Sequence, residues 1–302
     1  MQESDYPPFL ASEYAPRSLQ QAAFYILPVP LEQSVSYGAG TALGPGAILR
    51  ASQQLEAWEA GRYAGRRGFC TDEPIDCARD IETILAEIEA KVSFAVQNHA
   101  LPVLLGGEHT LSLGALRAFA HLFQEDVGIV QIDAHADLRE SYEGNPYSHA
   151  SVMYRAVADL HYRLVQFGVR EFCPAESETR RRFGVLAHDA DELADLGLPE
   201  VIVPLDFPRK VYVTFDVDGL DASLMPATGT PSPGGLFWHD ARRLLTRLAQ
   251  QRQIVGFDVV ELAPKPGLHS ADFTAAKLVH LLMALCLDSF DETIVNTEES
   301  VF

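Results

Sequence analysis

Short apolar runs alternate with amphipathic stretches along most of the chain, and this alternation limits the possible folds more than any other feature of the sequence. The runs are rich in Val, Ile, Leu and Phe, and they cover residues 102–105, 127–132, 164–167, 211–215 and 254–259. Such runs are typical of strands buried on both faces of a sheet. Apolar residues at helical spacing fill the stretches at 81–95, 111–123, 241–249 and 271–287. The alternation predicts an α/β fold in which helices cover both faces of a mostly parallel sheet.

No feature of the sequence divides the chain into separate parts. Its 302 residues permit one large α/β domain or two ordinary ones, and neither an internal repeat nor a low-complexity linker interrupts the pattern. Residues 180–210 are polar and of mixed charge, which fits a loop and helix excursion better than a domain boundary. We therefore predict a single domain over residues 1–302, with a turn at Gly44-Pro45-Gly46 that leads into a short helix at 47–51.

The composition excludes several classes of partner. The formal net charge is −19 and the calculated pI is about 4.8, which argues against nucleic acid and mildly favours small cationic molecules. The four cysteines lie far apart, without the two-residue spacing of zinc or redox motifs. The first ten residues do not resemble a signal peptide, and no apolar run reaches the roughly 20 residues of a bilayer span. We expect a cytoplasmic protein that binds no membrane.

Acidic residues and histidines follow the carboxyl ends of the apolar runs, where open parallel sheets bind ligands. The run at 127–132 leads into Asp133, His135 and Asp137, which alternate with alanines. If this segment is extended as it leaves the strand, all three side chains point to one side. Two carboxylates and an imidazole suit a hard-to-borderline ion such as Mn(II). The pattern predicts a metal site, although a lone Asp-x-His would indicate only a solvated loop.

Two further apolar runs end in the same way. The run at 211–215 leads into Asp216 and Asp218, and Gly219 then permits a sharp turn. Taken alone, this segment could equally be an acidic turn. The run at 102–105 leads through Gly106 and Gly107 to His109. A single histidine there would more often be structural, but its place after a strand matches the other two segments.

Charge balance predicts how these groups are used. Four carboxylates crowded into one site repel one another, whereas two divalent ions neutralise them. A water shared between two such ions loses a proton near neutral pH and becomes a nucleophile. The sequence thus predicts a two-metal hydrolytic site with the ligands His109, Asp133, His135, Asp137, Asp216 and Asp218.

These motifs resemble those of the ureohydrolase family, which comprises the arginases, the agmatinases and their relatives. Residues 106–109 are similar to the family's Gly-Gly-Asp-His motif, and residues 133–137 are similar to its Asp-Ala-His-x-Asp motif. Residues 215–221 resemble the start of its third signature, which continues through 228–231 and 234–236. The matches come in the family's order and span most of the chain, so the set is far more specific than each motif alone.

The resemblance implies a role for each residue. One Mn(2+) would be held by His109, Asp133, Asp137 and Asp216, and the other by Asp133, His135, Asp216 and Asp218. His149 would carry a proton to the leaving amine, Glu261 would grip the guanidinium, and Thr230 would contact the same group. Alternatively, His149 is a surface loop histidine, Glu261 a solvated acid after a strand and Thr230 an ordinary turn residue. The implied fold is a three-layer αβα sandwich of about eight strands, assembled as trimers or hexamers.

The resemblance is strongest to the agmatinase branch, which implies hydrolysis of agmatine to putrescine and urea in polyamine biosynthesis. Arg139 stands where arginases usually have Asn, and either Glu140 or Glu143 could receive the amine of agmatine. Glu108 replaces the frequent Asp at a position that is not a metal ligand, so we expect little effect. Aminopropylagmatine, 4-guanidinobutyrate and arginine remain open as substrates. A zinc-dependent amine deacetylase and a binding protein with an inactive site are the alternatives from other classes.

Overall fold

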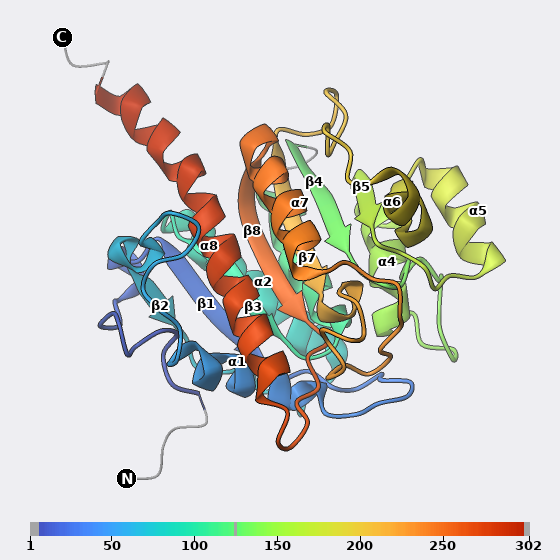
Figure 1. The fold of residues 1–302 in the computed structure, drawn as a ribbon, viewed down its shortest axis with the longest axis horizontal. Coiled ribbons are helices and arrows are strands. Elements are labelled where there is room, and N and C mark those ends of the chain that lie inside the picture. Colours follow the sequence, from blue (N-terminus) through green and yellow to red (C-terminus); the bar gives the residue numbers. More distant parts are fainter. Residues whose placement is uncertain (1–5, 124–125, 299–302) are drawn as a thin grey trace.

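The chain builds one continuous parallel sheet. The computed structural model describes residues 6–123 and 126–298, and its eight strands follow the order β2-β1-β3-β8-β7-β4-β5-β6 with every neighbouring pair parallel (Figure 1). The strands are β1 (Phe24–Val29), β2 (Phe69–Thr71), β3 (Leu101–Gly106), β4 (Val127–Ile132), β5 (Leu164–Phe167), β6 (Leu186–His188), β7 (Lys210–Asp216) and β8 (Gln253–Val260). The prediction of a mostly parallel sheet of about eight strands is confirmed.

Helices cover both faces of this sheet. They are α1 (Gly44–Ser52), α2 (Ile81–Gln97), α3 (Ser112–Phe123), α4 (Val152–Ala158), α5 (Pro174–Phe183), α6 (Ala190–Leu196), α7 (Trp238–Gln251) and α8 (His269–Glu298). Side chains of α1, α7 and α8 share one core with the sheet, and those of α2, α3 and α4 share a second core with its other face. Figure 1 shows α7 and α8 crossing one face, with α5 and α6 beside β5. This is the three-layer αβα arrangement that the sequence predicts.

The five apolar runs of the sequence are the central strands β3, β4, β5, β7 and β8. Three strands were not predicted. β2 and β6 have three residues each, which is too short for a periodic pattern. β1 contains Pro28, which cannot donate to a ladder. Pro28 is tolerated because β2 pairs only with residues 24–26 of β1, so the ladder on that side has already ended.

Helix α8 is the long apolar helix of the described chain. Its segment His269–Leu287 has the length and hydropathy of a membrane span, but 72% of the most apolar window is buried inside the fold, as in the core helix of a globular protein. His280 of α8 is fully buried near Phe9, and in the described part of the chain neither of its ring nitrogens has a hydrogen-bond partner. Burial lowers the pKa of His280 to about 4, against the opposing effect of Glu59.

Because all strands are parallel, their carboxyl ends lie at one edge of the sheet. The strands β1, β3, β8, β7 and β4 are neighbours in that order. The loops that follow them therefore meet, although they are far apart in sequence. This edge collects the loop after Val29, His109, the segment 133–137, Asp216 with Asp218, and Glu261.

Candidate metal centre and active site

His109 is a deeply buried member of the candidate centre. It begins a single 3-10 turn after β3, and Gly107 precedes it because a Cβ there would lie 2.1 Å from the carbonyl oxygen of Leu31. Its Nε2 lies 2.7 Å from Thr214 Oγ1. Among the described residues, its Nδ1 has no hydrogen-bond partner although the ring is buried. An orphaned buried nitrogen of this kind is what a metal ligand requires.

Thr214 fixes which nitrogen of His109 carries the proton. The Thr214 hydroxyl donates to Asp258 Oδ1 at 2.7 Å, so its oxygen is left to accept from His109 Nε2–H. Tyr212 donates to the other Asp258 oxygen at 2.9 Å. With Nε2–H directed to Thr214, Nδ1 is the nitrogen that faces the centre, and it would offer its lone pair to a bound cation, as metal-binding histidines generally do.

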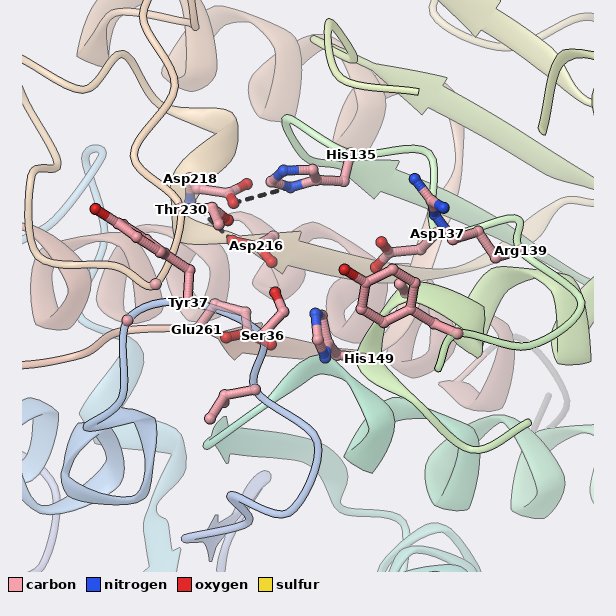
Figure 2. A pocket seen from close by; sticks show the side chains of 15 residues that line it. Ser36, Tyr37, His135, Asp137, Arg139, His149, Asp216, Asp218, Thr230 and Glu261 are labelled. Atoms are coloured by element: carbon pink, nitrogen blue, oxygen red, sulfur yellow. Dashed lines mark hydrogen bonds and ion pairs between the residues drawn. The ribbon is translucent and has the colours of Figure 1, made fainter. Parts of the chain in front are cut away.

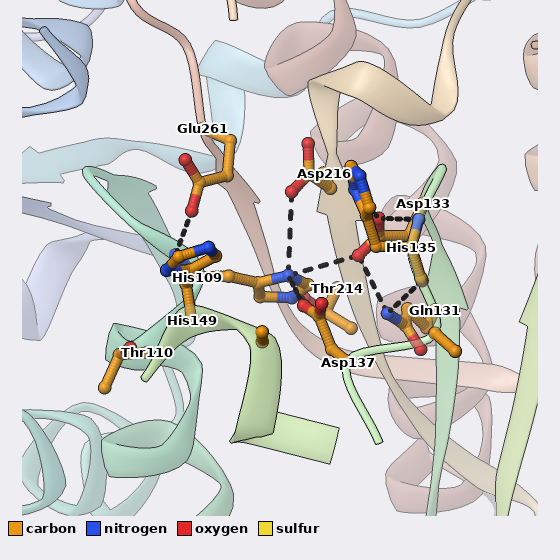
Figure 3. A network of polar contacts seen from close by, with 12 residues as sticks. His109, Thr110, Gln131, Asp133, His135, Asp137, His149, Thr214, Asp216 and Glu261 are labelled. Carbon is orange, nitrogen blue, oxygen red and sulfur yellow. Dashed lines mark hydrogen bonds and ion pairs between the residues drawn. The ribbon is translucent and has the colours of Figure 1, made fainter. Parts of the chain in front are cut away.

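Three carboxylates lie around Nδ1 of His109. His109 Nδ1 lies 3.0 Å from Asp137 Oδ2, 3.2 Å from Asp133 Oδ2 and 3.7 Å from Asp216 Oδ2 (Figure 3). A second group lies beside the first, in which His135 Nδ1 is 3.1 Å from Asp218 Oδ2 and 3.6 Å from Asp133 Oδ1.

The two groups overlap at Asp133. His109, Asp133 and Asp216 form one set of closely spaced ligand atoms, and Asp133, His135 and Asp218 form the other. All six predicted ligands thus meet at one place. Asp133 belongs to both sets, which fits its expected bridging position. Asp216 belongs only to the first, so its bridging role remains a prediction.

The local geometry differs from the extended segments expected from the alternating pattern. Asp137 has a φ of 53°, and Asp218 lies in a 3-10 turn, Val217–Gly219. Asp133 Oδ1 accepts from the backbone N–H of His135 at 2.6 Å, and Asp216 Oδ1 accepts from that of Asp218 at 2.8 Å. The side chains therefore converge through turns that their own carboxylates stabilise, and not through a strand-like alternation.

The electrostatics of the cluster favour cations. Burial, reinforced by Asp133, raises the pKa of Asp137 to about 7. Burial and then Asp218 raise the pKa of Asp216 well above its ordinary value. Burial lowers the pKa of His135, but Asp218 and Asp133 outweigh this effect and raise it to about 12. Two divalent cations would neutralise these carboxylates, and oxygen-rich donors with two imidazoles suit Mn(II) or Zn(II).

The predicted substrate residues line the same cavity. A space of about 230 Å³ is lined by Val35, Ser36, Tyr37, Gly38, His135, Asp137, Arg139, Tyr142, His149, Ala150, Asp216, Asp218, Gly229, Thr230 and Glu261 (Figure 2). Glu261 follows β8 with a φ of 65°, and its Oε1 accepts from the backbone N–H of His109 at 2.7 Å. Burial raises the pKa of Glu261 to about 8. A buried carboxylate at the wall of this cavity can pair with a cationic group.

His149 is held by a buried acid that the sequence analysis undervalued. Glu108 accepts from the backbone N–H groups of Gln33 and Ser34 at 2.8 and 2.7 Å, and from the Ser34 hydroxyl at 3.0 Å. Ser34 Oγ then accepts from the His149 backbone N–H at 3.0 Å and lies 3.3 Å from its Nδ1. Since Ser34 donates its proton to Glu108, this contact favours a proton on Nδ1 and a lone pair on Nε2; Ser148 Oγ also lies 3.4 Å from Nδ1. Burial lowers the pKa of His149, which favours the neutral ring.

The Arg139 side chain points toward Tyr142 and Glu176. Its guanidinium lies 5.1 Å from the ring centroid of Tyr142, and its Nε lies 3.7 Å from Glu176 Oε2. Glu140 and Glu143 are exposed and neither lines the cavity, so the structure does not support the interpretation that they receive the substrate amine.

Two groups of residues around this centre were not predicted from the sequence. The first comprises Ser34, Ser36 and Tyr37, whose signal was the unrecognised strand β1 that ends just before them. The second comprises Thr214 and Asp258 together with two buried glutamines described below. Their signal was one polar residue inside an otherwise apolar run, as in Tyr-Val-Thr-Phe at 212–215.

A parallel α/β sheet that carries overlapping Asp/His groups at the carboxyl ends of its strands defines a class of metal-binding enzymes. Comparisons with known proteins narrow this class. A family model described as Arginase family matches residues 22–286. The chain is 35% identical over 285 residues to the N(1)-aminopropylagmatine ureohydrolase of a Synechocystis strain, which covers 91% of this chain and 92% of the relative.

Two further comparisons agree. The chain is 30% identical over 284 residues to the agmatinase of Pyrococcus horikoshii, covering 88% of this chain and 93% of the relative. The solved structure of the agmatine ureohydrolase of Thermoplasma volcanium superposes with a TM-score of 0.85 at 32% identity, over 94% of this chain and 96% of that one. The chain therefore belongs to the arginase family. It is an agmatinase-like ureohydrolase, an enzyme class that acts on guanidino compounds.

Proposed function

We propose that the enzyme hydrolyses the guanidino group of an aliphatic polyamine derivative to urea and an amine, with two Mn(2+) ions per chain. The observation that carries this proposal is the meeting of two overlapping Asp/His groups and Glu261 around one cavity. Bound cations would supply electrostatic stabilisation and lower the pKa of a water shared between them. The overall charge of −19 favours the approach of a cationic substrate.

The residues of the chain would bind the substrate and move its proton. Glu261 keeps one oxygen on the His109 backbone N–H, which orients the carboxylate so that the other oxygen can pair with the guanidinium. His149 is a neutral histidine whose Nε2 lone pair can accept a proton and return it to the leaving amine. Thr230 lines the same cavity and would offer its hydroxyl to the guanidinium.

We place N1-aminopropylagmatine first among the substrates and agmatine second. The relative at 35% identity, which matches over nearly its whole length, is named for aminopropylagmatine, and the Thermoplasma volcanium structure with a TM-score of 0.85 is named for agmatine. Agmatine was the favoured substrate of the sequence analysis. The Arg139 guanidinium lies against Tyr142 and near Glu176, and this placement gives agmatine no particular advantage.

The test is urea release by the Mn(II)-loaded enzyme, with N1-aminopropylagmatine, agmatine, 4-guanidinobutyrate and arginine compared side by side. We expect the highest kcat/KM for aminopropylagmatine, and no urea after removal of metal with a chelator. A preference for another of these compounds would overturn the substrate assignment and retain the chemistry.

Metal content distinguishes the remaining alternatives. Two metal ions per chain by elemental analysis, with urea as product, support the proposal. One zinc ion per chain and amine release from acetylated polyamines would support a deacetylase instead. Binding of metal without any product would support a protein with an inactive site. The trimer or hexamer implied by the resemblance is proposed likewise, and sedimentation of the loaded enzyme tests it.

A further inference from the structure

A row of polar side chains crosses the buried sheet directly beneath the candidate metal centre. Gln166 of β5 is in register with Gln131 of β4, Gln131 with Thr214 of β7, and Thr214 with Asp258 of β8. All four side chains are completely buried, and none lines the cavity. Polar groups buried in this way destabilise a fold unless they are hydrogen-bonded. The hydrogen bonds of these four side chains therefore indicate which part of the site they support.

One half of the row forms a continuous chain of hydrogen bonds that ends on Asp133. Arg180 Nε of α5 donates to Gln166 Oε1 at 2.8 Å. Gln166 Nε2 donates to Gln131 Oε1 at 2.6 Å, and Gln131 Nε2 donates to Asp133 Oδ2 at 2.8 Å. Figure 3 shows the last of these contacts, with Gln131 reaching from β4 to the carboxylate that belongs to both ligand groups.

The direction of this chain is required at both of its ends. A guanidinium can only donate, so Gln166 must turn its oxygen toward Arg180 and its NH2 group toward Gln131. Gln131 must then present its oxygen to Gln166 and its NH2 group to Asp133. The carboxylate of Asp133 and the carbonyl group of Ala136 can only accept, so the near end requires the same direction, and a reversed Gln131 would bring a carbonyl oxygen against a carboxylate oxygen. Donor–donor or acceptor–acceptor contacts in a buried site are strongly unfavourable.

The same two amides also hold the backbone of the loop that carries the ligands. Gln166 Nε2 donates to the carbonyl oxygen of Ala136 at 2.8 Å, and Gln131 Nε2 approaches that of His135 at 3.3 Å. The two glutamines therefore hold the segment 133–136 through hydrogen bonds to one side chain and two backbone carbonyl groups. A reversed amide would lose all of these contacts together.

Arg180 is itself fixed in place. Its Nη1 lies 3.0 Å from an Asp189 oxygen, its guanidinium lies 4.7 Å from the ring centroid of Phe172, and its side chain is 11% exposed. A guanidinium clamped in this way presents Nε in one direction only.

We propose that Arg180, Gln166 and Gln131 are positioning residues of the metal centre, because their one-way hydrogen-bond chain across the sheet orients Asp133 and the 135–136 backbone. The inference rests on the metal centre of the proposed function but not on its substrate. Partners of this kind typically change metal affinity by 10–100-fold when they are removed.

The test compares two neighbouring arginines of α5. Arg180→Met removes the donor at the distant end of the chain and leaves Gln166 Oε1 buried without it. Arg181→Met is the matched control, because within the described residues Arg181 pairs with Glu178 on the exposed face of the same helix and not with the row of polar side chains. We expect Mn(II) affinity, measured by equilibrium dialysis on the metal-stripped full chain, to weaken about tenfold in Arg180→Met and to stay within twofold of the parent in Arg181→Met.

A second variant separates positioning from packing. Gln166→Glu keeps the shape of the side chain and its contact with Arg180, but the introduced carboxylate cannot donate to Gln131 or to Ala136. We expect the cooperative thermal unfolding of the metal-free chain to be retained and Mn(II) affinity to fall about 10–100-fold. Parental affinity in folded Gln166→Glu or folded Arg180→Met would overturn the proposal. Because the readout is metal binding and not urea release, a wrong substrate assignment would leave this result unchanged.

Discussion

Replacement of Thr214 by valine tests whether the tautomer of His109 prepares the metal centre. The change exchanges a hydroxyl for a methyl group of the same shape, so it creates no cavity. It removes two contacts, the 2.7 Å approach of His109 Nε2 and the 2.7 Å bond donated to Asp258 Oδ1. His109 would then have no acceptor at Nε2, and the tautomer with the proton on Nδ1 would become accessible.

The magnitude follows from the burial of both partners. A buried group left without its hydrogen bond costs about 1–3 kcal/mol, and a bond to a charged group contributes about 1.5–3 kcal/mol. Asp258 retains the Tyr212 hydroxyl, which limits its loss. We therefore expect Thr214→Val to destabilise the metal-free fold by about 2–4 kcal/mol and, because the ligand nitrogen must shed a proton, to weaken Mn(II) binding by about 10–100-fold.

The assay pairs denaturant unfolding of the metal-free chain with a Mn(II) titration of the same preparation. Tyr212→Phe is the matched control, since it removes a different donor to the same Asp258 carboxylate and leaves the contact between Thr214 and His109 intact. The control should lose stability by about 1–3 kcal/mol while it binds Mn(II) with the parental affinity. Equal Mn(II) affinities in Thr214→Val and Tyr212→Phe would refute the reasoning.

Three further changes probe other parts of the molecule. In Glu261→Gln the contact with the His109 backbone survives but the charge is lost, so KM should rise by about 10–100-fold with unfolding unchanged; a change in kcat alone would contradict this role. In Glu108→Asp the shorter carboxylate loses its reach to Ser34, so steady-state assays should show kcat about tenfold lower at constant Mn(II) affinity, whereas parental kcat would mean that His149 is positioned otherwise. The pKa of His280 is about 4 in the folded chain and about 6.5 in the unfolded chain, so the unfolded chain binds the proton more tightly. The contribution of neutral His280 to the free energy of unfolding should therefore be fully present above pH 6.5, and about 3 kcal/mol should be lost as the pH falls from 6.5 to 4. His280→Leu should remove that part of the acid loss in urea titrations, and parallel curves for parent and variant would show that His280 does not titrate on unfolding.

The strands of the sheet centre could be predicted because burial on both faces leaves a continuous apolar signature. β4, for example, has the bounds that were predicted from its run of Val, Ile and Gly around Gln131. The edge strands β2 and β6 carry no such signature, because three residues at the margin of a sheet need not be apolar throughout. The excursion at 180–210 accordingly contains the end of α5, β6 and α6, which charge and polarity alone did not resolve.

The convergence of the candidate ligands could be predicted for a different reason. Each motif is local in sequence, and the fold topology brings the motifs together. Parallel strands place all carboxyl ends at one edge, so short motifs far apart in sequence converge without any further information. The supporting contacts lacked a local signal. Glu108 and Ser34 are 74 residues apart, and Arg180 reaches Asp133 only through two glutamines on different strands. Such pairings depend on strand order and register, which the sequence pattern does not specify.

The spacing of the ligand motifs has its own physical cause. In Asp133-Ala134-His135 and in Asp216-Val217-Asp218, the first carboxylate accepts the backbone N–H of the third residue through Oδ1. This turn commits one oxygen to the local backbone and leaves Oδ2 beside His109 Nδ1, at 3.2 Å for Asp133 and 3.7 Å for Asp216. An acid followed two residues later by a second candidate ligand therefore forms a local turn that directs one free carboxylate oxygen toward the centre. Two such turns, at the ends of the adjacent strands β4 and β7, bring two free oxygens together, which is the arrangement that a pair of divalent cations requires.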